Sequence, residues 1–229
     1  MRLVFKAALA AIVVVLTGCA SAPSGPIALA PGAAASGRIG VAMSPVPQVD
    51  TSFPGAGCLL CLATASAANR TLTVHTQTLP SDEVAKLKKQ LAQVLAKKNK
   101  TVTVIDAPID MESLPSSSAQ GTNVAKKDFA SLKKTHDVDK LLLIQIQSIG
   151  IERPYSAYIP TGAPVAVFTG AGYLVNLATN TYEWYQPVRI VRAADGNWDE
   201  PPKFPGLTNA YFQTLELGKD EIIKPFAAP

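Results

Sequence analysis

Residues 141–146, Leu-Leu-Leu-Ile-Gln-Ile, form the stretch that decides the predicted fold. The first four residues are all apolar, which is typical of a strand in the middle of a sheet with helices packed on both faces. From Gln145 onward polar and apolar residues alternate, so one face of this end is expected to meet solvent. The stretch therefore predicts the central strand of an α/β domain.

The residues before this strand alternate between strand and helix patterns. Residues 38–43 and the β-branched run 101–105 each predict a strand, and so does the alternation of residues 71–79. Ser81 is expected to cap an amphipathic helix, because apolar residues recur after it at helical spacing. These residues are Val84, Leu87, Leu91, Val94 and Leu95.

The central strand lies between a predicted helix and a predicted hairpin. A helix capped by Asn123 and running to Thr135 precedes that strand, and residues 165–177 and 181–192 follow it as a predicted hairpin. Residues 207–223 predict a closing helix, weakened by Gly218. This order predicts an α/β fold: a single domain with a mixed sheet, in which helix-strand crossovers precede an antiparallel meander and a C-terminal helix.

The first residues have the character of an export signal. Arg2 and Lys6 make the start positive, and the apolar run of residues 7–16 is too short to cross a bilayer. Leu16-Thr17-Gly18-Cys19 then resembles the lipobox of bacterial lipoproteins. The resemblance implies that residues 1–18 are removed and that Cys19 is acylated as the first residue of the mature chain.

The same resemblance implies a location in the cell. Ala20 follows the cysteine where lipoproteins kept at the inner membrane carry Asp, which implies transfer to the cell outer membrane. We expect the domain to face the periplasm. Residues 19–36 are rich in Ala, Pro, Gly and Ser and predict a flexible tether. Residues 37–229 are left as the globular domain, which is anchored to the membrane through acyl chains.

Composition argues against nucleic acid as a partner. The formal charge of +4 includes Arg2 and Lys6, so about +2 is left after processing. The lysines lie mainly on two predicted helices, between acidic and apolar residues, whereas nucleic-acid binding needs one strongly basic surface. We expect these lysines to form solvated helix faces.

A second resemblance rests on the order of elements. Val138-Asp139 followed by Leu141-Leu142-Leu143-Ile144, and the later run from Gly172 to Trp184, are similar to a family of envelope α/β domains. The family includes the amino-terminal domain of the Tol-associated periplasmic protein, the curli-channel lipoprotein and lipoproteins that activate penicillin-binding proteins. The resemblance implies an adaptor or assembly role and carries over no catalytic residue.

Residues 53–68 form an apolar insertion into this pattern. They contain no charged residue and are too few to span a bilayer. A buried core helix or packed loop is the first interpretation, and contact with the membrane, a partner or the subunits of an oligomer is the second.

Cys58 and Cys61 lie inside this insertion, in a compartment that permits disulfides. A structural disulfide or two buried thiols is the first interpretation. A redox pair is an alternative, because Gly57 permits a helix to begin at Cys58. A metal site would have to add His75 and His136, which lack the paired spacing of known sites.

The sequence does not favour an enzyme. His136 with Asp137 and Asp139 could supply part of a triad, but capping of a helix-to-strand turn explains both aspartates. The chain has neither a Gly-x-Ser-x-Gly elbow nor a glycine loop that would bind phosphate. We therefore expect no catalysis, no cofactor and no metal.

Aromatic residues in proline-rich loops are the better candidates for function. Tyr155 and Tyr158 form one cluster, and Trp198 and Phe204 form another. Rigid aromatic side chains are enriched at interfaces, although these could instead cover the sheet as a lid. The sequence predicts a non-catalytic adaptor or assembly factor that acts through protein contacts; thiol-redox or metal chemistry, and a membrane-contacting oligomer, are the alternatives.

Overall fold

The computed structural model describes residues 25–227 and contains one mixed sheet of six strands. Neighbouring strands follow the order β3-β1-β4-β7-β8, and β2 pairs with the far end of β4. The strands are β1 (Ile39–Met43), β2 (Asp50–Ser52), β3 (Val102–Val104), β4 (Lys140–Glu152), β7 (Val165–Asn176) and β8 (Thr181–Ala193). The short hairpin of β5 (Tyr155–Ser156) and β6 (Ile159–Pro160) stands apart from this sheet.

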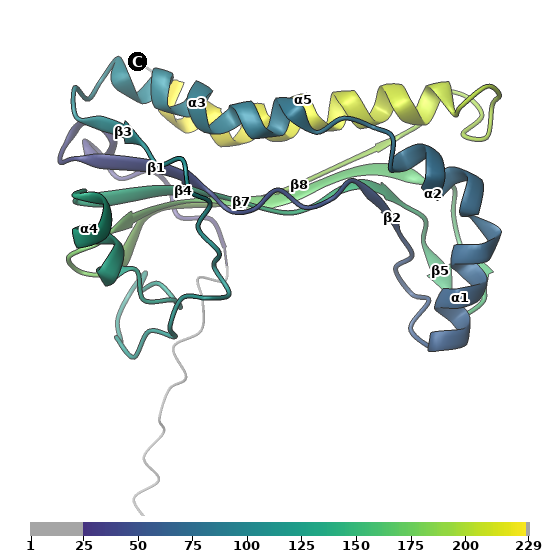
Figure 1. Cartoon of the computed structure of the whole chain (residues 1–229), viewed down its shortest axis with the longest axis horizontal. Coiled ribbons are helices and arrows are strands. Elements are labelled where there is room, and N and C mark those ends of the chain that lie inside the picture. The colour runs from purple at the N-terminus through teal and green to yellow at the C-terminus, as the bar shows by residue number, and fades with distance from the viewer. Residues whose placement is uncertain (1–24, 228–229) are drawn as a thin grey trace, which may run out of the picture.

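Helices are distributed over both faces of the sheet (Figure 1). The helices are α1 (Leu59–Ala68), α2 (Arg70–Thr76), α3 (Asp82–Ala96), α4 (Ala130–His136) and α5 (Pro205–Ala227), with a short 3₁₀ turn at Ala33–Ala35. The helices α3 and α5 run side by side along one face, whereas α4 lies on the other.

The predicted central strand is confirmed. β4 pairs in parallel with β1 and β2 and antiparallel with β7, so it joins the parallel and antiparallel halves of the sheet. The predicted hairpin is also present, as β7 and β8. The mixed α/β fold class with a C-terminal helix is therefore confirmed.

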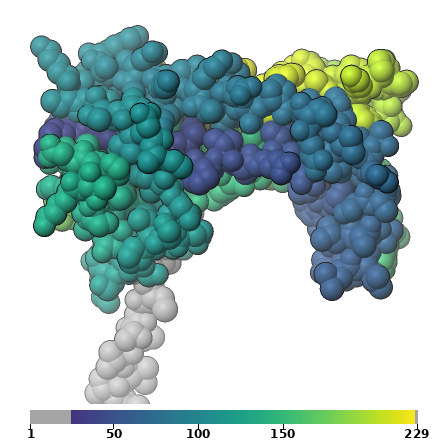
Figure 2. Space-filling view, in the orientation of Figure 1, coloured from purple at the N-terminus to yellow at the C-terminus, as the bar shows by residue number. Residues whose placement is uncertain are grey.

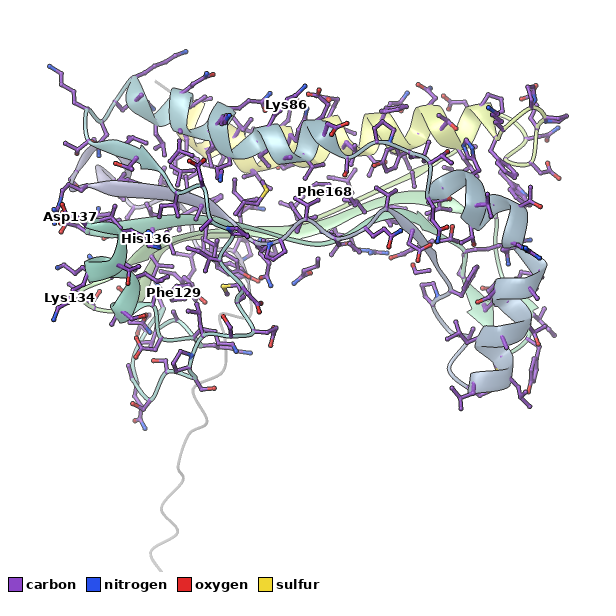
Figure 3. The ribbon with its side chains drawn as sticks, viewed as in Figure 1. Lys86, Phe129, Lys134, His136, Asp137 and Phe168 are labelled. Carbon is purple, nitrogen blue, oxygen red and sulfur yellow. A yellow bond between two sulfur atoms is a disulfide. The ribbon has the colours of Figure 1, made fainter. Side chains whose placement is uncertain are left out.

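Alternate residues of β4 enter two separate cores, because successive side chains of a strand point to opposite faces. Leu142 and Ile144 pack with α3 and α5, whereas Leu141 and Leu143 pack with Phe129 beside α4. Figure 3 shows Phe168 and Phe129 on these opposite faces of the sheet. Both faces of β4 are buried, which explains its unbroken apolar start.

Gly218, which is predicted to weaken the closing helix, lies where α5 packs on β7. A Cβ atom at this position would lie 2.5 Å from Cδ1 of Phe168. Glycine therefore lets the helix approach the sheet closely, and α5 continues through Gly218 to Ala227.

Two predicted elements are wrong. Residues 71–79 were expected as a strand, but residues 70–76 form α2. Leu72 and Thr76 are its buried residues, four apart on one helix face, and the Thr76 hydroxyl donates to the Leu72 carbonyl at 2.9 Å. Asn123 caps no helix: α4 begins seven residues later, and the carbonyl of Asn123 accepts a hydrogen bond from the Tyr182 N–H.

The predicted tether is partly wrong as well. Ile27 forms a bridge with Tyr185 at the edge of β8, and Ala33 and Ala34 are buried. The predicted flexibility of residues 19–36 therefore does not hold from Ile27 onward. The predicted signal peptide, 1–18, and the acylated Cys19 lie outside the described residues. None of the helices in residues 25–227 is both long and apolar enough to span a membrane.

The described chain has the shape of an arch (Figure 2). One support contains α4 and the loop before it, and the other contains α1 with the β5–β6 hairpin. We call the second support the arm and define it as residues 53–69 and 154–161. The two segments are joined by backbone hydrogen bonds, including Tyr155 N–H to the Pro54 carbonyl at 2.7 Å.

Candidate functional site

The arm has a small core of its own. Tyr155 packs there with Ala56, Cys61 and Ala65, and the ring of Phe53 meets it edge-on at 5.9 Å between centroids. The Tyr155 side chain is only 7% exposed. Tyr155 therefore holds the arm together, and its predicted place on a partner surface is wrong.

Asn69 fixes this core at the base of the arm. Its Nδ2 donates to the hydroxyl of Tyr155 at 2.7 Å and to the Ala65 carbonyl at 2.7 Å. Its Oδ1 accepts a hydrogen bond from the Arg153 guanidinium. These hydrogen bonds give Asn69 and the Tyr155 hydroxyl the partners that buried polar groups require, whereas the buried Nε of Arg153 has no hydrogen-bond partner among the described residues.

Cys58 and Cys61 are joined by a disulfide across the first turn of α1. Cys58 is the N-cap residue, and its Sγ accepts the Cys61 N–H at 3.0 Å. The metal alternative would need His75, which lies on α2, and His136, which ends α4. The redox alternative stays a prediction, because the disulfide begins at the N-cap of α1. Within residues 25–227 no three His, Cys, Asp or Glu side chains gather in a way that could hold a metal ion.

The far end of the arm exposes large apolar side chains. A core helix was the first interpretation of residues 53–68, but only the small residues Cys61 and Ala65 of α1 face inward. We define the arm tip as the exposed side chains beside the disulfide. It consists of Leu59 (89% exposed), Leu60 (71%), Leu62 (46%), Tyr158 (51%) and Ile159 (68%).

A groove of about 510 Å³ lies at the other end of the arm, between α2 and the loop 197–204. Val74, His75, Pro201 and Phe204 supply most of its apolar wall, with Thr71, Thr78, Asp199, Glu200 and Lys203 around it. The ring of His75 lies 5.4 Å from that of Phe204. The groove is therefore mainly apolar and has charged residues at its border.

Of the predicted pair Trp198 and Phe204, Phe204 lines this groove, and Trp198 stacks against Phe204 outside the lining. Their rings are parallel, with 6.2 Å between centroids, and both are half-buried. The Arg153 guanidinium lies 4.8 Å from the centre of the Trp198 ring, a distance suited to a cation–π contact. Trp198 and Phe204 therefore pack partly on the main core and are partly available to a partner.

The backbone that carries Phe204 is strained. Lys203 and Phe204 have φ values of 62° and 52°, in the left-handed region that only glycine adopts without cost. Each such residue costs about 1–2 kcal/mol. The surrounding contacts stabilise this conformation, among them the Phe204 N–H to the Glu200 carbonyl at 3.2 Å. Strain of this kind is concentrated at functional sites in proteins.

His75 is a titratable group in the groove wall. Its Nε2 lies 2.8 Å from the Thr208 hydroxyl at the start of α5. Burial, and secondarily the positive charge of Lys203, lower the pKa of His75 below its usual 6.5. The neutral ring is therefore the form that the fold favours.

We expect the groove to make stability depend on pH. Because the pKa of His75 is lower in the folded chain, the unfolded chain binds more protons just below pH 6.5, and folding stability falls there. The loss ends below the folded pKa. Urea unfolding between pH 7 and pH 5 should show this slope in the parent and a smaller slope in His75→Gln, whose amide can still bond Thr208. Equal slopes would contradict the assignment.

The candidate triad is a structural turn. Asp139 Oδ2 accepts from Arg38 Nε at 3.1 Å, and Asp137 also bonds the Arg38 guanidinium. The hydrogen bonds from the Arg38 side chain and backbone N–H lower the pKa of Asp139 to about 2. Figure 3 places His136 and Asp137 together where α4 ends. Both aspartates therefore bind Arg38 and connect α4 to β4.

A second hollow on the α4 face of the sheet was missed from the sequence. Tyr173, Tyr182 and Tyr185 stack there with 5.2 to 5.8 Å between ring centroids. They line a space of about 350 Å³ together with Met111, Glu112, Lys126, Lys127, Gln145 and Gln147. Burial raises the pKa of Tyr173, so its hydroxyl stays protonated and donates to Gln145 Oε1 at 2.9 Å. The hairpin register could have revealed the pair, because Tyr173 lies opposite Tyr185.

Comparison with known proteins gives only distant similarities. No protein-family model matches the chain, and no curated protein does. A PelC variant from Paraburkholderia phytofirmans, solved as a dodecamer, is 9% identical, with 90% of this chain and 96% of that chain covered and a TM-score of 0.36. A protein of Xanthomonas campestris from the family DUF330 is 13% identical, with 89% and 95% covered and a TM-score of 0.37. A hypothetical protein of Chlamydia trachomatis is 8% identical, with 82% and 99% covered and a TM-score of 0.29.

Proposed function

We propose that this chain is a lipid-anchored, non-catalytic protein of the cell outer membrane that faces the periplasm and acts as an adaptor or assembly factor. The resemblance of Leu16-Thr17-Gly18-Cys19 to a lipobox supports the anchor. Two or three acyl chains, at about 0.8 kcal/mol per buried methylene, would make attachment effectively permanent.

The groove beside α2 supports the adaptor role and is the observation on which it rests. Its wall contains the exposed Val74 and the ring of Phe204, which stacks on Trp198, and the strained loop keeps Phe204 in place. Such preformed apolar hollows accept an aromatic or aliphatic side chain at low entropic cost. The occupant we propose is an apolar side chain of a second envelope protein.

The partners of the reactive groups also favour binding over catalysis. Asp137 and Asp139 bind Arg38, and Cys58 and Cys61 bond each other. His75 contacts a hydroxyl, that of Thr208, and its ring packs on Phe204. These contacts give each of these groups a structural role. The apolar surface of the groove is therefore the feature that we propose to bind a partner.

Site-specific crosslinking in the native host tests this proposal. A photoreactive phenylalanine analogue at position 74 is expected to yield one discrete adduct, and Phe204→Ala should reduce that adduct strongly. The analogue at Phe212, an exposed residue on α5, is the matched control and should not yield it. Thermal unfolding of each variant checks that the fold is retained. If position 74 yields no adduct, or if the adduct is indifferent to Phe204→Ala, the groove is not the contact surface.

A further inference from the structure

We propose that the arm tip lies in the head-group region of the same membrane that holds Cys19, as a second point of attachment. This inference rests on the proposed lipid anchor and adds a lipid surface as the partner of the arm. It explains why Leu59, Leu60 and Ile159 are exposed, although large apolar side chains are normally buried.

The two segments that form the tip carry no charge. Residues 53–69 and residues 154–182 contain no Asp, Glu, Lys or Arg. They meet at the tip, where the Tyr158 hydroxyl lies 3.6 Å from Cys58 Sγ and the Ala157 N–H donates to the Gly55 carbonyl at 3.2 Å. A cluster of exposed apolar side chains drawn from two uncharged segments is typical of an interaction surface. The absence of charge avoids the large cost of desolvating charged side chains against lipid.

The position of the tip matches the path of the anchor. Ile27 packs with the core on the α4 face of the sheet, and in Figure 1 the arm extends from the sheet on this same side. Cys19 precedes Gly25 by only six residues, which can extend about 20 Å at most. An acylated Cys19 would thus hold the membrane near the side of the molecule toward which the arm extends.

The local structure of the tip indicates how deeply it inserts into the membrane. α1 begins at the tip, and the first N–H groups of a helix have no partner within it. Unpaired N–H groups are costly in hydrocarbon but find water and phosphate oxygens among head groups. The disulfide closes this first turn, on which Leu59 and Leu60 are exposed. We therefore infer shallow insertion, with the leucines at the boundary between head groups and acyl chains.

Lipid quenching of tryptophan fluorescence tests the inference. The lipidated full chain from its host, carrying Leu60→Trp, would be reconstituted in vesicles of phosphatidylethanolamine and phosphatidylglycerol. Its added emission, after subtraction of the parent chain, is expected to shift to the blue and to be quenched by lipids brominated near the head group. Bromine near the chain end should quench less. Ile159→Trp, on the other segment, should behave alike, whereas Phe212→Trp on α5 should be unaffected.

The outcomes separate this inference from the proposed function. Intact mass of the same sample shows whether Cys19 is acylated; an unacylated chain would overturn the proposed anchor. If Cys19 is acylated but positions 60 and 159 are no better quenched than position 212, the arm tip does not contact lipid. A blue shift that depends on protein concentration and persists without quenching would show a second copy on the tip, and would also overturn the inference.

Discussion

Replacement of Trp184 by alanine is expected to lower the free energy of unfolding by about 3–5 kcal/mol, because it would leave a large cavity in the main core. The Trp184 side chain is 1% exposed and meets the ring of Phe226 edge-on at 4.9 Å. It also lies over Gly172, where a Cβ atom would come within 2.2 Å of its ring. Trp184 therefore joins the last turns of α5 to β8 and lies against β7.

Urea unfolding monitored by circular dichroism measures this loss. Trp198→Ala is the matched control, since Trp198 is half-buried in a loop and its removal should cost clearly less. Equal losses for the two variants would contradict the cavity explanation.

Glu183→Ala is expected to cost about 3–5 kcal/mol as well, because it leaves a buried lysine without its counter-charge. Lys140 is 8% exposed, and its Nζ lies 2.7 Å from Glu183 Oε2. The same Nζ donates to the Ala33 carbonyl at 2.9 Å and to the Ser36 hydroxyl at 3.1 Å. The ion pair therefore also holds residues 33–36 against the sheet.

The double variant Lys140→Met, Glu183→Leu distinguishes a lost charge pair from a lost side chain. Replacing both partners of a buried pair by apolar residues is often close to neutral, so the double variant should recover most of the stability. Limited proteolysis of Glu183→Ala should also cut near Ser36 sooner than in the parent. A double variant as unstable as Glu183→Ala would contradict the buried-charge explanation.

Much of the sheet could be predicted because its local patterns agree with its burial. The apolar start of β4 reflects cores on both faces, and the turn between β7 and β8 sets their antiparallel pairing. The apolar spacing of α3 likewise follows its one buried side. Where local preference and tertiary packing coincide, sequence reasoning is sufficient.

The wrong predictions concern segments whose structure is determined by tertiary contacts. The alternation of residues 71–79 fits a strand, but the buried pair Leu72 and Thr76 fits the helix that packs there. The small-residue composition of residues 27–36 suggests a tether, but Ala33 and Ala34 are small enough to fill space beside the main core. Neither contact can be predicted from the sequence without knowing which element packs against the segment.

The candidate sites were predicted in part. Trp198 and Phe204 were singled out from the sequence and do stack on each other, but of the two Phe204 lines the groove, which His75 and Val74 complete from a segment predicted as a strand. Tyr155 and Tyr158 were grouped as neighbours, yet one is in the core of the arm and the other at its tip. Composition identified residues 53–68 as unusual; only the inward direction of Cys61 and Ala65 shows that the leucines face out.

The mature amino terminus is the measurement that tests the central claim most directly. Intact and peptide mass spectrometry of the protein from the membranes of its own host should find a chain that begins at Cys19, with the mass of the acyl groups on that residue. A chain that still begins at Met1, or one that begins elsewhere without lipid, would contradict the proposed anchor and the membrane contact of the arm.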